Sequence, residues 1–581
     1  MTAAVGAPRR SVLRRLLPRR ADYAGLRRSW ARDLAAGVTV GVVALPLALG
    51  FGVASGVGAA PGLVTAVIAG AVAAVFGGSS LQVSGPTGAM TVVLVPLVAA
   101  HGPGVVVPVA VMAGVLVVAA AVLGMGRLLA YVPWPLVEGF TVGIAVVIAA
   151  QQVPSALGLP QPEIENALAA AASVVSTFAA RPDWTVVGLL ALAVALTAVL
   201  PRLHRAVPAS LLAVAAVTLV VELSGVEVPT IGELPSSLPM PALPDFGHAG
   251  DLVGAAVVVA FLAALESLLS ARVADGMIDA PRHDPDRELF GQGLANVASG
   301  LFGGLPATGA IARTAVNARA GARTRVAALT HAVVLAAIVY AASGAVGRIP
   351  LVALAGVLLV TAYRMVERHT VRAVLTSTRG DAAVFLLTAV ATVAIDLVTA
   401  VAVGLAAAVV LAVARLGRTA RVVAEETTDD SGTVERALLA ERVLTYRLDG
   451  PLFFAVADRL LREIAATEDV DVVILRAGSV AMLDATGAHA LGRVIEDLER
   501  RGITVLVKVA GEEQLRLLTA VGALRHLADR GHVFTGLADA VAHAARHVTP
   551  VGPVQNPRSE ATVDSGTWTT ASNASDTGVA R

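Results

Sequence analysis

The sequence has no cysteine, a single lysine (Lys508) and few charged residues for its 581 residues. Without cysteine, disulfides, thiolate metal sites and cysteine nucleophiles are excluded. Only 15% of the residues are charged and 56% are hydrophobic, whereas soluble proteins carry about 25% charged residues. Glycine and proline lie within the apolar stretches, which transmembrane helices tolerate because neighbouring helices satisfy the freed backbone groups. The composition therefore indicates a membrane protein.

The sequence also lacks the usual signatures of enzymes. We find no Ser/His/Asp set, no metal-ligand spacing and no phosphate-binding loop, so we expect neither catalysis nor a metal or cofactor, and no nucleic-acid partner. The first 32 residues hold nine arginines and no apolar run of signal-peptide length, so we expect no cleaved leader. The abundance of Arg, Ala and Val is typical of a GC-rich bacterial genome.

Apolar runs long enough to span a bilayer, or interrupted as in broken helices, occur in two groups of seven. The first group lies near residues 34–54, 62–77, 87–100, 104–124, 134–151, 184–200 and 207–222. The second lies near residues 250–271, 288–302, 309–318, 325–345, 350–363, 381–395 and 398–414. Residues 164–180 are Ala-rich but short, which predicts an interfacial helix.

The arginines support this count through the positive-inside rule. With the Arg-rich segment 1–32 in the cytoplasm, nearly all arginines in the loops of the membrane region fall in inner loops; Arg181 and Arg348 are the exceptions. Those loops hold, among others, Arg127, Arg202, Arg272, Arg287, Arg325, Arg372 and Arg415. We therefore expect a multi-pass inner-membrane protein with both termini cytoplasmic.

After the membrane region, residues 33–421, the pattern changes to short alternating runs. Strands are predicted at 443–448, 472–475 and 503–507, and helices at 484–500 and 512–520. Alternating strands and helices indicate a small α/β domain over 440–547. Residues 548–581 are rich in Ser, Thr, Asn and Gly, so we expect a disordered tail.

A short motif is repeated at the same place in each group of spans. Gly85-Pro-Thr-Gly-Ala-Met90 opens the third span, and Pro306-Ala-Thr-Gly-Ala-Ile311 opens the tenth. Proline and glycine before a short apolar segment predict a broken helix whose N-terminus, equivalent to about half a positive charge, points to the midplane. Two such ends facing each other would bind an anion. The alternative is two ordinary kinked spans that share a tripeptide by chance.

Two ionisable residues interrupt the apolar spans, Glu266 in the eighth and Arg313 in the tenth. Each costs roughly 2.5–3.5 kcal/mol at a helix centre, so we expect a Glu–Arg pair. Arg313 would add a full positive charge to the anion site, and Glu266 would take up a proton; the alternative is a purely structural pair. Gln82, Ser84 and Thr87 are further hydrogen-bond donors, whereas His331 is expected near a span end, at the interface.

These residues lie in motifs that resemble the sulfate permease family of anion transporters, also called solute carrier family 26. The resemblance covers about residues 30–547 and is carried by Asp33–Ala48, Phe76–Ala89 and Asn296–Gly309. In addition, Asp484-Ala-Thr-Gly487 resembles the loop–helix signature of STAS domains.

The resemblance implies a polytopic helical fold of 14 spans, a 7+7 inverted repeat in which spans 1–4 and 8–11 form a core and the rest a gate. It also implies a homodimer, and an anion between the third and tenth half-helices with first-span residues alongside. The implied substrate-binding residues are Leu47, Gln82, Ser84, Thr87, Gly88, Ala89, Thr308, Gly309, Ala310 and Arg313.

The resemblance further suggests where coupling and regulation reside. Leu47 stands where some members carry an acidic residue or Gln, so coupling is not expected there. Glu266 and Arg313 resemble proton-coupled sulfate members, whereas sodium-coupled bicarbonate members have an aspartate and no arginine. Asp484 and Thr486 are candidate regulatory residues, because soluble STAS relatives are phosphorylated at the hydroxyl matching Thr486. The STAS domain would also offer a site for a cytoplasmic protein partner.

Proton-linked sulfate uptake is thus the leading hypothesis, with the proton as coupling ion. A bicarbonate or C4-dicarboxylate transporter and a passive anion channel or exchanger are alternatives. A uracil or xanthine permease would usually lack the C-terminal α/β domain and would need hydrogen-bonding carboxylates rather than an arginine. A fourth alternative is a sensor in which the membrane part only reports anion binding to the C-terminal domain.

Overall fold

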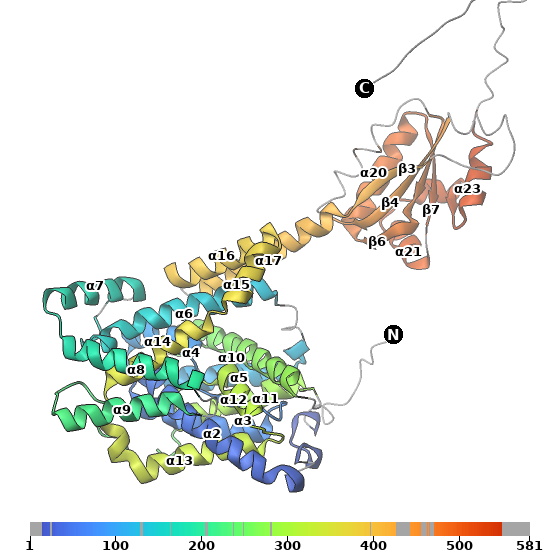
Figure 1. The fold of residues 1–581 in the computed structure, drawn as a ribbon. Coiled ribbons are helices and arrows are strands. Elements are labelled where there is room, and N and C mark those ends of the chain that lie inside the picture. The colour runs from blue at the N-terminus through green and yellow to red at the C-terminus, as the bar shows by residue number, and fades with distance from the viewer. Residues whose placement is uncertain are drawn as a thin grey trace, which may run out of the picture. The chain divides into compact units, whose positions relative to one another are not determined.

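The computed structural model describes residues 14–548, apart from 24–25, 128–131, 163, 165, 204–206, 236, 248, 279–281, 396, 426–441, 455–461, 463, 465–469 and 510. The chain divides into two compact units, Met1–Val409 and Val410–Arg581 (Figure 1). We call them the membrane unit and the C-terminal unit. The predicted disordered tail, 548–581, lies outside the described residues except for Val548.

The membrane unit is helical. After the short η1 (Arg20–Tyr23), its first part comprises α2 (Leu26–Ala54), α3 (Ala59–Phe76), β1 (Ser84–Gly85), α4 (Gly88–His101), η2 (Pro103–Val105), α5 (Val106–Val122), α6 (Trp134–Ala156), α7 (Ala167–Ala180), α8 (Trp184–Leu203) and α9 (Ala209–Ser224). Its second part comprises α10 (Ala249–Met277), α11 (Pro285–Leu301), β2 (Thr308–Gly309), α12 (Ile311–Arg319), α13 (Val326–Gly347), α14 (Leu351–Met365), α15 (Arg368–Ser377), α16 (Arg379–Ala394) and α17 (Leu397–Arg418).

Each predicted span coincides with one of these helices, and α7 falls where the interfacial helix is predicted. The amphipathic α15 was not predicted, because its arginines are typical of a cytoplasmic loop. Among the described residues, seven helices are long and apolar enough to cross a membrane, or eight if the bent pair Val326–Val339 and Ala341–Gly347 is one span. Shorter apolar helices such as α4 and α9 do not meet that length, so fourteen spans remain a prediction.

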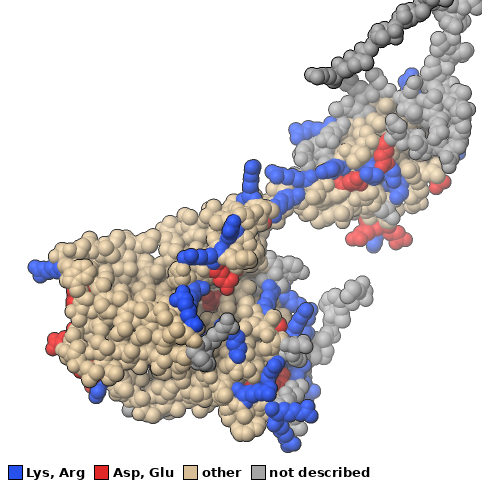
Figure 2. Space-filling model, in the orientation of Figure 1, with Lys and Arg blue, Asp and Glu red and all other residues tan. Residues whose placement is uncertain are grey.

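The helices pack mainly in two sets, which match the predicted core and gate. In one set α11 packs against α3 and α5, α13 against α2 and α3, and α10 against α5 and α12. In the other set α6 packs against α14 and α16, and α8 against α9 and α14. Figure 2 shows that a large part of the drawn face of the membrane unit carries no charged side chain, as a lipid-facing surface requires.

Two of the arginines counted with the inner loops are buried. Arg287 and Arg325 are 5% and 3% exposed, and Arg287 donates to both carboxylate oxygens of Asp22, at 2.8 and 2.5 Å. Although burial raises the pKa of Asp22, the hydrogen bonds and charge of Arg287, with the charge of Arg325, lower it to about 2. The positive-inside pattern alone could not show this, because it counts charge and ignores local pairing.

The C-terminal unit is an α/β domain, as the sequence predicts. Its strands are β3 (Arg421–Glu425), β4 (Val443–Leu452), β5 (Val472–Arg476), β6 (Val480–Leu483), β7 (Thr504–Lys508) and β8 (Val533–Phe534). They are ordered β3-β4-β5-β7-β8, with β6 paired to β4, and only β3 runs antiparallel to its neighbour. The helical elements are η4 (Ala477–Ser479), α20 (Ala485–Arg500), α21 (Glu512–Ala520), α22 (Arg525–Asp529) and α23 (Leu537–Ala544).

Candidate functional site

The two repeated motifs meet inside the membrane unit. The strands β1 and β2 pair in antiparallel register, Ser84 opposite Gly309 and Gly85 opposite Thr308. The helices α4 and α12 begin within three residues of these strands, and no side chain caps either N-terminus. The first backbone N–H groups of a helix have no partner within that helix. The predicted juxtaposition of two helix N-termini is therefore confirmed.

Glu266 lies between the two motifs, where it accepts hydrogen bonds from both. Its Oε2 is 2.9 Å from the hydroxyl of Thr87 and 2.6 Å from that of Thr308. The two hydroxyls are themselves 3.2 Å apart. The expected Glu–Arg pair is absent, since no ion pair joins Glu266 to Arg313 among the described residues. Instead, the hydroxyls of the two threonines satisfy the carboxylate.

Arg313 is buried, with 2% of its surface exposed, and only part of its guanidinium is satisfied. Nη2 donates to the carbonyl of Pro86, whereas Nη1 has no hydrogen-bond partner in the described part of the chain. Nη1 lies against Gly85, where any Cβ would overlap it. A buried cationic N–H without an acceptor is costly, and the binding of an anion by this group stays a prediction.

Gln82 provides a second unsatisfied group at the same place. It is 6% exposed, and neither its Oε1 nor its Nε2 has a partner among the described residues. The amide lies against Gly309, where a Cβ would overlap Nε2. An anion could accept from Nε2, as predicted for this residue.

Several other predicted donors already have partners. The hydroxyl of Ser84 donates to Gln292 at 2.9 Å, the N–H of Gly309 donates to Ser267 at 3.0 Å, and the N–H of Ala310 donates to the carbonyl of Val83 at 2.9 Å. These groups hold β1 and β2 in place and are not free to bind a substrate in this structure. The sequence could not show this, because the partners lie on other elements.

The remaining predicted residues pack against apolar side chains of the membrane unit. Gly88 faces Ile148 and Phe51 closely, so that a Cβ there would overlap Ile148. Ala89 is part of the main apolar cluster of the membrane unit. Leu47 is half-buried and packs against a separate apolar cluster, so its place beside an anion stays a prediction.

Two amides on α11 support β2 and were missed by the sequence analysis. Asn296 Oδ1 accepts from the N–H of Ala307 at 2.8 Å, and the side chains of Gln292 and Asn296 both donate to the Ala307 carbonyl, at 2.8 and 2.9 Å. Both are fully buried. Their spacing of four residues within an apolar helix was a signal that could have revealed them.

His331 was expected at the interface but is fully buried, because it lies one turn inside α13. Both ring nitrogens lack hydrogen-bond partners among the described residues. A Cβ on Gly70 of α3 would lie 3.7 Å from the His331 ring. The site therefore has a further polar side chain close to α3 that hydropathy alone did not identify.

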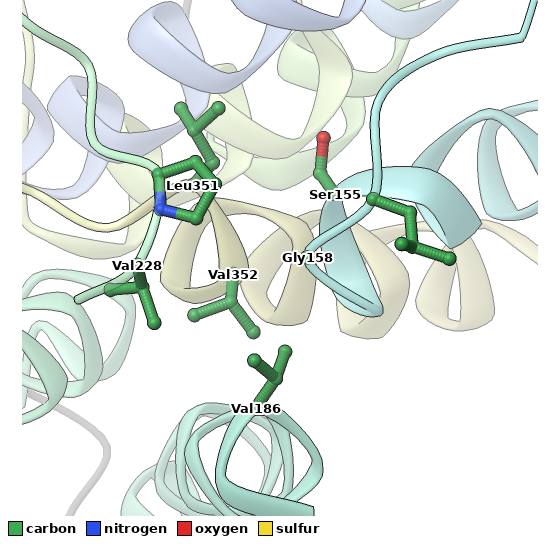
Figure 3. Close-up of a pocket in the computed structure, with 8 residues that line it drawn as sticks. Ser155, Gly158, Val186, Val228, Leu351 and Val352 are labelled. Atoms are coloured by element: carbon green, nitrogen blue, oxygen red, sulfur yellow. The ribbon is translucent and has the colours of Figure 1, made fainter. Parts of the chain in front are cut away.

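A pocket elsewhere in the membrane unit does not compete with this site. Figure 3 shows it lined by Ser155, Gly158, Val186, Val228 and Val352, at the ends of α6, α8 and α14. Its lining is mostly aliphatic and includes no cationic side chain. Such a pocket offers an anion no counter-charge.

Comparison with known proteins identifies the architecture described above. Residues 30–388 match the Sulfate permease family, and residues 437–540 match the STAS domain. The chain belongs to the sulfate permease family. It is therefore a transporter with a C-terminal STAS domain and not an enzyme, as the sequence predicted.

Relatives of this permease are similar along most of their length. This chain is 35% identical over 519 residues to "Putative sulfate transporter YvdB" of Bacillus subtilis, and the match covers 87% of this chain and 96% of that protein. It is 32% identical over 508 residues to "Bicarbonate transporter BicA" of Synechocystis, covering 84% and 89%. The structure of murine Solute Carrier 26 family member A9 in the inward-facing state is similar in fold, with a TM-score of 0.81, 16% identity and coverage of 94% and 96%.

The candidate regulatory residues of this permease lie at the start of α20. Asp484 is its N-cap, where Oδ1 accepts from the N–H of Gly487 at 2.7 Å and Oδ2 from that of Phe454 at 3.1 Å. Thr486 is exposed in the first turn of the helix. A phosphate there would be favoured by the helix N-terminus but opposed by Asp484, so regulation through Thr486 stays a prediction.

Close packing at Gly309 gives a first prediction. In Gly309→Ala the new Cβ would overlap Nε2 of Gln82 and lie 3.1 Å from Cα of Ser267. We expect slower transport and a loss of about 1–3 kcal/mol of stability from overpacking, measured by flux into proteoliposomes and by chemical denaturation. Gly254→Ala on α10, where a Cβ meets open space, is the matched control. If Gly309→Ala transports at the wild-type rate, the close contact between Gly309 and Gln82 is not needed for transport.

Proposed function

We propose that this permease is a secondary active transporter of a small anion, with proton-linked sulfate uptake as its principal activity. The observation that carries the proposal is the buried Arg313 Nη1, which has no partner among the described residues and lies where α4 and α12 begin. One full positive charge and two helix N-termini suit a doubly charged oxyanion better than an uncharged substrate. A uracil or xanthine permease therefore fits this site less well.

Coupling to protons is supported by Glu266. Its carboxylate contacts a threonine from each motif, Thr87 and Thr308. Ionisable residues at membrane depth commonly serve as proton relays. A passive channel would need no titratable group at this position.

Bicarbonate is the second candidate, because a relative of 32% identity is named a bicarbonate transporter. Arg313 favours sulfate over bicarbonate, since a dianion gains more from a buried guanidinium than a monoanion does. C4-dicarboxylates carry the same charge as sulfate but need more room.

We also propose that the protein lies in the bacterial inner membrane with both termini in the cytoplasm. The arginines between helices, counted by the positive-inside rule, support this orientation. Arg127 after α5, Arg202 at the end of α8 and Arg319 at the end of α12 all fall on the predicted cytoplasmic side.

The decisive experiment compares anions side by side in proteoliposomes that contain the purified protein. We expect saturable counterflow of labelled sulfate, which unlabelled sulfate inhibits more strongly than bicarbonate, fumarate or chloride do. Acid outside should drive accumulation of sulfate. Flux that does not saturate and ignores the pH gradient would indicate a channel, and no flux of any anion would favour the sensor alternative.

A further inference from the structure

Three histidines gather in the C-terminal unit, far along the chain from the anion site. His532 immediately precedes β8, His543 lies in the last turn of α23, and His547 follows four residues later. One ring nitrogen of each lies within 4.8 Å of those of the other two. The three ring centroids are 5.1–5.3 Å apart.

The backbone around the rings is held by the sheet and by helix packing. The N–H of His532 donates to Leu527 and its carbonyl accepts from Val507 of β7, both at 2.9 Å. On α23, Ala540 and Ala544 are fully buried in the apolar cluster beneath the sheet. The three imidazoles are therefore brought together by the packing of α23 beside β8.

One of the rings has an unsatisfied buried nitrogen. His532 is 6% exposed, and its Nδ1 has no hydrogen-bond partner among the described residues. Leaving such a group unpaired in the interior is unfavourable. Burial lowers the pKa of His532 and of His543, and the neighbouring His547 lowers both further.

We propose that His532, His543 and His547 form a binding site for a divalent transition metal, with Zn²⁺ as the ion it suits best. Around tetrahedral zinc each Zn–N bond is about 2.0–2.1 Å, which places ligand nitrogens about 3.3 Å apart. The Nε2 atoms of His543 and His547 are 3.2 Å apart. The third ring nitrogen lies within 4.8 Å of both, and the fourth position would be left to water.

The sequence analysis expected no metal site and did not single out these three histidines. His543 and His547 have the spacing of two ligands on one helical face, but the third histidine lies eleven residues upstream of His543. Only the return of α23 beside β8 brings the third ring to the pair. A bound ion would tie the end of α23 to the edge strand and stabilise the C-terminal unit, because the unfolded chain does not hold the three rings together.

The test uses the full chain in detergent, purified through a tag that contains no histidine. We expect isothermal titration with Zn²⁺ to give one site per chain, and Co²⁺ to give the absorption spectrum of a tetrahedral complex. His547→Ala and His543→Ala should each weaken Zn²⁺ binding by at least about tenfold and abolish the Co²⁺ spectrum. Because His547 is exposed, its removal does not disturb the core.

His489→Ala and His526→Ala remove exposed histidines of the same unit, on α20 and α22, and should bind both ions as the wild type does. If the wild type binds neither ion, the three rings are only a hydrogen-bonded histidine cluster and the proposal is wrong. Equal affinity in the wild type, His547→Ala and His543→Ala would overturn it as well.

Discussion

Arg313→Ala is expected to abolish detectable substrate binding. The guanidinium is the only full positive charge that we place at the start of α4 and α12 in the described structure. Its buried Nη1 makes no hydrogen bond to any described residue, so it is available to an anion. Removing one partner of a buried charge-assisted hydrogen bond costs about 2–5 kcal/mol, which corresponds to about 30-fold to several thousand-fold in affinity. Titration of the purified protein with sulfate, and counterflow in proteoliposomes, would measure the loss.

Arg319→Ala is the matched control, because Arg319 is exposed at the C-terminal end of the same helix. It should bind sulfate normally. Arg313 also donates to the carbonyl of Pro86, so the thermal transition of the variant should be compared with that of the wild type. If Arg313→Ala binds sulfate with unchanged affinity, the residue has a structural role and the anion site lies elsewhere.

Most of the helices could be predicted from the sequence, because a long apolar run in a membrane protein has few alternatives to a helix. Even the broken spans were recognisable, since Pro86 and Pro306 stand directly before short apolar segments. The amphipathic α15 was missed for the opposite reason: its apolar content is too low for a span, and its arginines are typical of a loop.

The anion site was predicted less completely. The repeated Thr-Gly-Ala tripeptide located both helix N-termini, and the structure confirms that they meet at β1 and β2. The sequence could not distinguish free donors from occupied ones, since Ser84 and Gly309 are satisfied by Gln292 and Ser267 from other helices. The Glu–Arg pair was wrong for a related reason. Two threonine hydroxyls, rather than the guanidinium, satisfy the carboxylate of Glu266.

The arrangement of Glu266 allows its protonation to depend on the anion. When the site is empty, a nearby positive charge such as that of Arg313 favours the ionised form of a carboxyl group. An anion bound to Arg313 would neutralise part of that charge and bring its own negative charge near Glu266. Proton uptake then becomes easier when the anion is bound, and by linkage the anion binds more tightly when Glu266 is protonated.

The two threonines permit this change without an unsatisfied group. Ionised Glu266 accepts from the hydroxyls of Thr87 and Thr308. A protonated carboxyl must donate instead, and a hydroxyl can turn to accept because it offers lone pairs as well as a hydrogen. Both protonation states of the carboxyl can therefore be accommodated between the same two motifs.

Glu266→Gln is accordingly expected to separate exchange from accumulation. The amide mimics the protonated carboxyl, so the variant should bind sulfate and exchange it in counterflow at a rate near that of the wild type. It should lose accumulation driven by acid outside, which for one proton per sulfate can reach about tenfold per pH unit in the absence of a membrane potential. Asp251→Asn, at the exposed start of the same helix, should retain both activities. If Glu266→Gln still concentrates sulfate under a pH gradient, the coupling proton binds at another residue and Glu266 serves only to hold the two threonines together.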